Sequence, residues 1–304
     1  MAWKKIGKFF EPDGSIDWMH SHAAVPFIDK ISEHTYKLYF TSRTKNNIST
    51  IGSLTFDSHF NIHKVNPEPV LTHGKIGMFD EHGVTGSYCL NINNKKYLYF
   101  VGWNQSKTTS FRNALGLAIS DDGGRTYRKI SEGPIVDRSP VDPSFVAGTC
   151  VYYDDELFKM WYISCVGWEI IDDKPRHYYH LKYATSKDGI NWDRKGIIAI
   201  DFKSKYEYAI SQPWVIKENG LYKMWYSFRG QQSIKTYRIG YAESVDGISW
   251  NRMDNQAGID VSEIGWDSQM ICYPYIFYLN NNRYMFYNGN NYGETGIGLA
   301  IWDA

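Results

Sequence analysis

The segment Tyr222-Lys223-Met224-Trp225-Tyr226 has four close copies elsewhere in the chain of 304 residues. The copies are Tyr36-Lys37-Leu38-Tyr39-Phe40, Lys96-Tyr97-Leu98-Tyr99-Phe100, Phe158-Lys159-Met160-Trp161-Tyr162 and Arg283-Tyr284-Met285-Phe286-Tyr287. Their central residues lie at positions 38, 98, 160, 224 and 285, so the spacings are 60, 62, 64 and 61 residues. Self-similarity at a fixed period of this size indicates a repeat architecture. Because five periods account for almost the whole chain, we expect residues 1–304 to form a single domain.

Two further elements follow the first in the same order. One is Ile239-Gly240-Tyr241-Ala242, which has copies at 51–54, 115–118, 181–184 and 297–300. The other is Ser244-Val245-Asp246-Gly247-Ile248-Ser249-Trp250, which has copies at 120–127 and 186–192. Asp-Gly between apolar runs is a strong hairpin signal. Each unit therefore reads as strand, strand, strand, turn, strand, which predicts an all-β, five-bladed β-propeller with four antiparallel strands per blade.

The Asp-Gly elements resemble the Asp-box turn found in sialidases and other propellers. We interpret them as turns that stabilise the fold, because Asp and Ser side chains in such turns bond to backbone groups of the turn itself. They carry little information about the reaction.

The composition excludes several partners. The 33 Lys and Arg residues balance 33 Asp and Glu residues, and no basic run indicates a nucleic acid or a membrane surface. No apolar stretch reaches the roughly 18 residues that span a bilayer, and the first residues lack the apolar core of a signal peptide. The four cysteines form no CxxC pair. We therefore expect a cytoplasmic protein that needs no cofactor.

The propeller predicts where polar side chains meet. The first strand of each blade lines the axis and the second runs back antiparallel, so residues before strand one and after strand two converge on one mouth. The first group contains Asp17, His20, His22, Asp80, Glu81, His82, Arg138, Asp142, Glu207, Gln212 and Asp267, and the second contains Arg43, Trp103, Trp168, Arg229 and Asn288. Carboxylates and amides bond hydroxyl groups, and indole faces stack on sugar rings. This mouth therefore suits a small-molecule or oligosaccharide substrate.

With these elements in place, the chain resembles the superfamily of five-bladed propeller glycosidases, which includes arabinanases, β-xylosidases, invertases and mannoside phosphorylases. Val141-Asp142-Pro143-Ser144-Phe145 is similar to the blade-three motif of the arabinanase and xylosidase branch, and the resemblance implies that Asp142 tunes the general acid. The blade-four motif of that branch carries Glu before a small residue and Pro, whereas this chain has Ser211-Gln212-Pro213. In blade one an Asp is expected, and the chain has His20-Ser21-His22.

We therefore expect a glycoside hydrolase-like enzyme that cleaves or transfers a glycosyl unit by carboxylate acid and base catalysis. Hydrolysis, phosphorolysis and transfer stay open at this point. The expected catalytic residues are Glu81, Asp142, Glu207 and Asp80. The expected substrate-binding residues are His20, His22, Arg43, His82, Trp103, Trp168, Gln212, Arg229, Asp267 and Asn288. The two arginines indicate an anionic group on the substrate, such as a phosphate, a uronate or a nucleotide.

Two alternatives remain. A non-catalytic, lectin-like propeller would keep the Trp and Arg residues but would need no acid with a shifted pKa. His20 and His22 alternate along a strand and, together with His82 and Asp80, would offer ligands for a divalent ion. The segment Glu169–His177 lies on the same mouth, where it serves as a lid, an oligomer contact or a plain surface loop.

Overall fold

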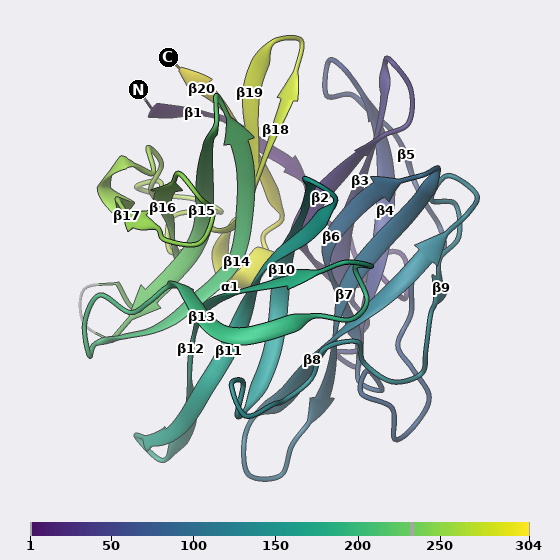
Figure 1. Cartoon of the computed structure of the whole chain (residues 1–304). Coiled ribbons are helices and arrows are strands. Elements are labelled where there is room, and N and C mark those ends of the chain that lie inside the picture. Colours follow the sequence, from purple (N-terminus) through teal and green to yellow (C-terminus); the bar gives the residue numbers. More distant parts are fainter. Residues whose placement is uncertain (1, 232–233, 304) are drawn as a thin grey trace.

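The computed structural model describes residues 2–231 and 234–303, and it is an all-β structure that confirms the predicted five-bladed propeller. Each blade is a group of four antiparallel strands (Figure 1). Blade 1 consists of β2 (Ser21–Lys30), β3 (Thr35–Arg43), β4 (Ser49–Asp57) and β5 (Ile62–Val65). Blade 2 consists of β6 (Val84–Ile92), β7 (Lys95–Gln105), β8 (Phe111–Ser120) and β9 (Arg128–Lys129).

The remaining blades repeat the pattern. Blade 3 consists of β10 (Phe145–Asp154), β11 (Leu157–Ile171), β12 (Lys174–Ser186) and β13 (Asp193–Ile200). Blade 4 consists of β14 (Glu207–Glu218), β15 (Leu221–Gly230), β16 (Arg238–Ser244) and β17 (Asn251–Arg252), followed by the short helix η1 (Asp254–Gln256). Blade 5 consists of β18 (Cys272–Leu279), β19 (Asn282–Asn288), β20 (Ile297–Asp303) and β1 (Ala2–Phe10), with the one-turn helix α1 (Asn290–Gly293) between β19 and β20.

Both ends of the chain build blade 5. Strand β1 pairs antiparallel with β20, from Ala2 opposite Asp303 to Phe10 opposite Ile297, and the two ends lie side by side in Figure 1. The repeats in the sequence did not identify β1, because this strand carries no copy of the recurring segments. Pairing the first strand with the last closes the ring of blades, and β1 forms the outer edge of blade 5.

The same aromatic segment occurs in every blade because its side chains contact the neighbouring blade. The fourth residue of the first segment is buried in every blade, and in three blades it bonds to the following turn. Tyr39 lies 3.0 Å from the hydroxyl of Tyr127, Tyr99 donates to the Gly189 carbonyl at 3.0 Å, and the Trp161 indole donates to the Gly247 carbonyl at 2.7 Å. At these three interfaces, an aromatic residue of one repeat thus meets the Asp-Gly turn of the next.

The Asp-Gly turns have the predicted internal bonds. In blade 3 the Asp188 carboxylate accepts hydrogen bonds from the Ser186 hydroxyl at 2.9 Å, from the backbone N–H of Ile190 at 2.8 Å, and from the backbone and side-chain nitrogens of Asn191 at 2.8 Å. The Asn191 amide is the largest of the influences that hold the pKa of Asp188 below its usual range. These turns are structural, as the sequence predicted.

The turn carboxylate gives a stability prediction. Asp188→Ala is expected to lower the midpoint of thermal unfolding by a few degrees at pH 7, because several backbone and side-chain donors lose their acceptor. The folded pKa lies below the unfolded value of about 3.9, so the stabilisation is present above that pH and is lost as the pH falls through the folded pKa. Thermal scans of both proteins from pH 7 to pH 3 should show the gap beginning to narrow below about pH 4. An unchanged gap at pH 3, or an equal effect of Lys187→Ala at the neighbouring exposed position, contradicts this interpretation.

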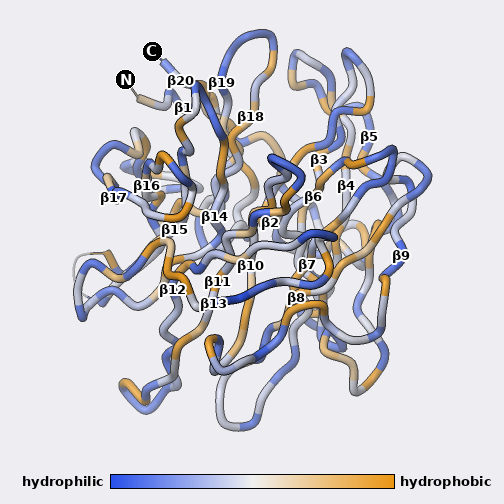
Figure 2. Tube along the Cα trace, in the orientation of Figure 1, coloured by the Kyte–Doolittle hydropathy of each residue, from blue (hydrophilic) through white to orange (hydrophobic). Residues whose placement is uncertain are grey.

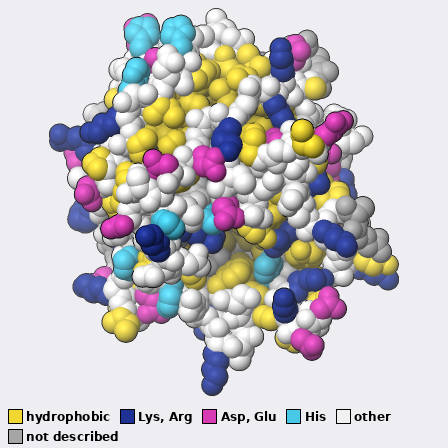
Figure 3. All heavy atoms as spheres, turned by 180° about the vertical axis from the view of Figure 1, so that it is seen from behind, with side chains coloured by type: hydrophobic (Ala, Val, Ile, Leu, Met, Phe, Trp, Pro, Cys, Tyr) yellow, Lys and Arg dark blue, Asp and Glu magenta, His cyan; other side chains and the backbone are white. Residues whose placement is uncertain are grey.

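The outer surface of the propeller carries both hydrophilic and hydrophobic side chains. Hydrophilic residues occupy the turn between β18 and β19, above the more hydrophobic strands of blade 5 (Figure 2). On the face shown in Figure 3, acidic and basic side chains are interspersed around an area of hydrophobic side chains in the upper half. In the described part of the chain, we find no helix with the length and apolar character to cross a membrane.

Candidate functional site

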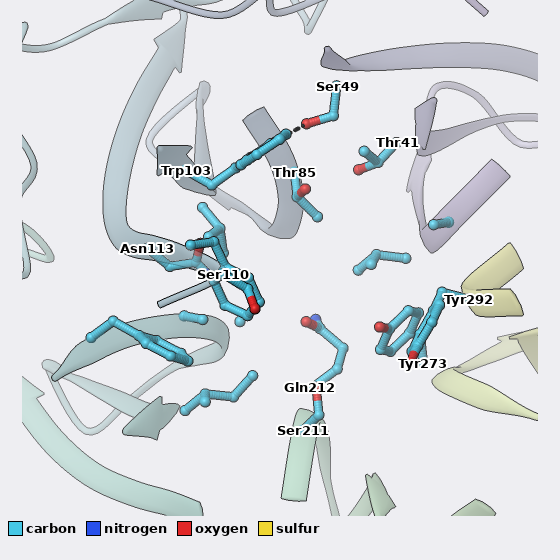
Figure 4. A pocket seen from close by; sticks show the side chains of 18 of the residues that line it. Thr41, Ser49, Thr85, Trp103, Ser110, Asn113, Ser211, Gln212, Tyr273 and Tyr292 are labelled. Carbon is cyan, nitrogen blue, oxygen red and sulfur yellow. Dashed lines mark hydrogen bonds between the residues drawn. The ribbon is translucent and has the colours of Figure 1, made fainter. Parts of the chain in front are cut away.

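A pocket of about 630 Å³ lies where the five blades meet. Every blade contributes to it, mainly through residues at the start of its first strand or the end of its second. Figure 4 shows Gln212 between Tyr273 and Tyr292 on one side and Trp103 and Asn113 on the other. These strand ends therefore surround one opening, as the strand directions predicted.

The pocket is closed along the axis. The first strands run away from the mouth, and a few residues further on Trp214 packs against Tyr88 and Tyr275, with ring centroids 5.1 and 4.0 Å apart. Because these rings fill the axis below Gln212, a ligand enters and leaves from one side.

Two arginines line the pocket without an acidic partner. Arg229 donates to the Tyr292 hydroxyl at 2.6 Å and to Nε2 of His177 at 3.2 Å, and its guanidinium lies over the Tyr237 ring at 4.6 Å. Its Nε has no hydrogen-bond partner in the described structure. Arg43 donates to Oδ1 of Asn47 at 3.0 Å. Neither guanidinium forms an ion pair with any carboxylate that the structure describes.

Both pocket histidines are neutral at pH 7. Burial, with the charge of Arg43 as a second influence, lowers the pKa of His22 to about 4. Burial and the charge of Arg229 lower the pKa of His177 to about 3. A neutral His177 has a free lone pair on Nε2, which explains how that atom accepts the hydrogen bond from Arg229.

The backbone is strained around the pocket. Among non-glycine residues, the left-handed region is occupied mainly by Asn and Asp in hairpin turns, but also by His22 (φ 63°), Gln212 (φ 45°), Tyr273 (φ 55°) and Tyr292 (φ 62°), all of which line the pocket. Such conformations cost on the order of 1–3 kcal/mol each and cluster at functional sites. His22, Gln212 and Tyr273 lie in the first strands β2, β14 and β18, and Tyr292 lies in α1.

The structure corrects the expected placement of four acids. Asp80, Asp142, Glu207 and Asp267 precede or begin the first strands of blades 2 to 5, as expected, but each is buried in an ion pair with the fourth strand of its own blade. The pairs are Asp80–Lys129, Asp142–Arg194, Glu207–Arg252 and Asp267–Lys5. None of the four acids lines the pocket. Their oxygens accept bonds inside the blade instead of facing the cavity.

Asp142 illustrates the arrangement. It is wholly buried, and its carboxylate accepts bonds from Arg194 at 2.8 Å, from the Ser164 hydroxyl at 2.7 Å and from the Tyr162 hydroxyl at 3.2 Å. Lys182 lies 3.6 Å away. These contacts tie the segment before β10 to the outer strands of blade 3.

A sequence signal for these pairs exists. The basic partner stands two positions after the aromatic residue of each Asp-Gly turn, as in Tyr127 and Lys129, Trp192 and Arg194, and Trp250 and Arg252. Aligning this position across the repeats would have identified the partners in blades 2, 3 and 4. Among the described residues, blade 1 has no such pair.

Glu81 also lies outside the pocket lining. It accepts bonds from the Gly77 N–H at 2.6 Å and the Asn104 amide at 3.0 Å, and these bonds lower its pKa. A carboxyl with a lowered pKa is ionised at pH 7 and is unsuited to donating a proton. The exposed residue Glu294, which caps α1, acts electrostatically on His22 and Arg43 but does not line the pocket either. The described lining therefore contains no carboxylate.

Other predicted site residues support the pocket from outside. His82 packs on Trp103 at 5.7 Å, Trp168 packs behind Phe111 at 5.6 Å, and Asn288 accepts a bond from the Val25 N–H at 2.8 Å. The predicted residues that do line the pocket are His22, Arg43, Trp103, Gln212 and Arg229.

The proposed metal ligands are not arranged around a common site. His20 is outside the pocket lining and its Nδ1 has no hydrogen-bond partner, and Asp80 is occupied by Lys129. No group of three His, Cys, Asp or Glu side chains in the described residues is placed to hold an ion. The divalent-ion hypothesis has no support in this geometry.

Several pocket residues were not predicted. They are Thr41, Thr85, Phe111, Asn113, Tyr179, Tyr237, Tyr273 and Tyr292. His177 was included only within the segment 169–177, which is not a loop but the hairpin of β11 and β12. Aligning the five repeats at the ends of their first and second strands would have identified Thr41, Thr85 and Tyr273.

Comparison with known proteins identifies relatives of the whole chain and of its fold. No family model matches. The chain is 37% identical over 303 residues, 99% of each chain, to the uncharacterized protein Rv1502 of Mycobacterium tuberculosis. It is 32% identical over 113 residues to the 1,2-beta-oligomannan phosphorylase of a Thermoanaerobacter species, covering 35% of this chain and 36% of that protein.

Among solved structures, that of BT0996 in an RGII complex matches 99% of this chain and 91% of its own length with a TM-score of 0.78 and 16% identity. A thermostable family-43 glycoside hydrolase matches 94% and 90%, with a TM-score of 0.68 and 16% identity. At these identities the likeness establishes the fold.

Proposed function

The chain belongs to the same protein family as Rv1502 of Mycobacterium tuberculosis and has the fold of the five-bladed propeller glycosidases, and from this we propose that it binds a phosphate-bearing sugar in the axial pocket and transfers the glycosyl unit to or from the phosphate. A carbohydrate ligand agrees with the relatives, since one is a 1,2-beta-oligomannan phosphorylase and one was solved in an RGII complex. For the protein we also propose a cytoplasmic location, where activated sugars are found.

The observation that carries the proposal is the pair of unpaired arginines. Removing a charge from water is costly unless an opposite charge compensates it. Arg43 and Arg229 are half-buried and have no acidic partner within the described residues, so an anion on the ligand is the natural counter-charge. A guanidinium binds phosphate through two parallel hydrogen bonds, which also fixes the orientation of the ligand.

The lining argues against glycoside hydrolysis by two carboxylates. That reaction needs one carboxylic acid to protonate the departing alkoxide and a second carboxylate as base or nucleophile. The described lining offers neither. A phosphate is a good leaving group that needs no proton, and arginines can stabilise the charge that develops on it. Glycosyl transfer with phosphate as leaving group is therefore compatible with a pocket without carboxylates. In the reverse direction, the departing sugar oxygen takes back the proton that Nε2 of His22 holds after the forward reaction.

The pocket residues then have distinct roles. Arg43 and Arg229 hold the phosphate. Trp103, whose indole N–H is fixed by the Ser49 hydroxyl at 2.9 Å (Figure 4), presents a ring to the apolar face of the sugar. In the direction that releases phosphate, neutral His22 takes the proton of the attacking hydroxyl. Its Nδ1 is engaged with the Ser21 hydroxyl at 2.9 Å, which leaves Nε2 for this task.

The second candidate function is binding of the same ligand without turnover. The observation in its favour is that four acids expected at the mouth stabilise the blades instead. Both functions require anion binding, and only the first requires reaction.

A binding and turnover assay tests the proposal. The full chain is titrated by calorimetry with inorganic phosphate, mannose 1-phosphate, glucose 1-phosphate and neutral mannose. The phosphates are expected to bind and mannose alone is expected to bind at least about tenfold more weakly, which corresponds to 1.4 kcal/mol. Release of phosphate from a glycosyl phosphate in the presence of mannose or mannobiose then separates transfer from binding alone. Equal affinity for mannose and mannose 1-phosphate would contradict a phosphate-bearing ligand.

A further inference from the structure

The pocket has two chemically different sides. Blades 1, 4 and 5 supply the cationic side, with Arg43, Arg229 and the tyrosines that surround them. Blades 2 and 3 supply an aromatic side, where Phe111 of the β7–β8 hairpin packs against Phe145 with ring centroids 5.4 Å apart. A sugar phosphate held on the arginines, with its sugar ring against Trp103, leaves Phe111 and the polar residues beside it without a use.

His177 connects the two sides. Its Nε2 accepts the bond from Arg229 at 3.2 Å, and its ring lies 5.6 Å from that of Phe111. The ring is also stacked on Tyr179 at 4.7 Å with an interplanar angle of 8°. A group on Arg229 is thus one histidine ring away from Phe111, so one ligand can occupy both sides.

The aromatic side carries polar groups with free bonding capacity. Gln105, Ser106, Ser110 and Asn113 line the pocket. The last two appear with Trp103 on one side of the cavity in Figure 4. No side-chain hydrogen bond joins any of the four to another described residue. Amides and hydroxyls beside a flat ring suit the edge of a nucleobase, which alternates donors and acceptors.

Resting on the proposed function, we propose that the glycosyl donor is a nucleoside-diphosphate sugar. Its diphosphate lies on Arg43 and Arg229, its sugar lies near Gln212 on the axis, and its base stacks on Phe111. Two guanidinium groups that form no ion pair with a described carboxylate match the two or more negative charges of a diphosphate.

The transfer step balances without a further reactant. The bond between the anomeric carbon and the β-phosphate oxygen breaks, and its electron pair leaves on the nucleoside diphosphate. The acceptor oxygen forms the new bond to the anomeric carbon, and its proton passes to Nε2 of His22.

The test compares each nucleoside diphosphate with pyrophosphate, which has the same anion and no nucleoside. The full chain is titrated with UDP, GDP, ADP, CDP, dTDP and pyrophosphate. At least one nucleoside diphosphate is expected to bind tenfold or more tightly than pyrophosphate. Phe111→Leu removes the ring while retaining apolar volume. It is expected to weaken that nucleotide by roughly 5- to 100-fold, from the usual strength of base stacking, and to leave pyrophosphate binding unchanged.

The control is Tyr153→Leu, which removes an exposed ring of β10 outside the pocket and is expected to change neither affinity. Thermal unfolding of both variants checks that they are folded. If pyrophosphate and mannose 1-phosphate bind while no nucleoside diphosphate binds more tightly than pyrophosphate, the inference is overturned and the proposed function stands. If no phosphate compound binds, both fail. Equal weakening of nucleotide and pyrophosphate by Phe111→Leu also overturns the stacking role.

Discussion

Replacing Asp142 with asparagine is expected to lower the free energy of unfolding by about 3–5 kcal/mol, the range for removing one partner of a buried ion pair. The carboxylate is wholly buried, and Arg194 and Lys182 would keep their charges with little access to water. The Tyr162 and Ser164 hydroxyls would lose their charged acceptor as well. Urea unfolding followed by tryptophan fluorescence measures the change.

Two further variants separate this structural role from a catalytic one. Asp137→Asn alters an exposed acid in the same segment and is expected to change the free energy of unfolding by less than about 0.5 kcal/mol. Adding Arg194→Met to Asp142→Asn is expected to restore part of the stability, since one of the two uncompensated charges is gone. A variant Asp142→Asn that is as stable as the parent but has lost turnover would restore the catalytic interpretation of this residue.

Replacing Arg229 with glutamine is expected to weaken binding of mannose 1-phosphate about 100-fold, within the range for truncating one partner of a buried charged pair. Arg229 is the pocket cation with the most complete support, through Tyr292, His177 and the Tyr237 ring. Lysine is not an adequate substitute because it cannot offer two parallel donors to one phosphate. Calorimetric titration of both proteins provides the measurement.

The stability of this variant adds a second readout. Removing the Arg229 charge stabilises the folded state, because a half-buried cation without a counter-charge is poorly solvated. Losing the cation–π contacts with the tyrosine rings destabilises it. The free energy of unfolding is therefore expected to stay within about 1 kcal/mol of the parent value. Arg138→Gln, at an exposed arginine outside the lining, is the matched control and is expected to bind normally. Full affinity of Arg229→Gln for mannose 1-phosphate would remove the basis of the proposed function.

The sequence located pocket residues where their position followed from the direction of a strand. Arg43, Trp103 and Arg229 lie at the ends of second strands, and His22 and Gln212 lie in first strands, and all five line the cavity. Chain direction fixes the end of a blade at which a residue lies, so such placements follow from the repeat alone. The pocket roles of these residues remain predictions.

The sequence was uninformative where the direction of a side chain mattered. Asp80, Asp142 and Asp267 stand in the expected segments, yet their carboxylates face the fourth strand of the blade. Position before a strand does not tell whether a side chain faces the axis or the sheet behind it. For this reason Asp142, which was assigned through a motif resemblance, and Asp80 and Asp267, which were assigned through strand position, were all expected at the mouth.

The amino-acid sequence by itself determined the number of blades and the Asp-Gly turns before the fourth strands of blades 2 to 4, because contacts between neighbouring blades repeat every 60 to 64 residues and leave a periodic record. Only the tertiary structure decided that β1 completes blade 5, that four acids pair with Lys5, Lys129, Arg194 and Arg252, and that the described pocket lining contains cations without carboxylates. The physical reason is that charge compensation depends on distances between side chains. Lys5 and Asp267, for example, are 262 positions apart in the chain and 2.7 Å apart in space.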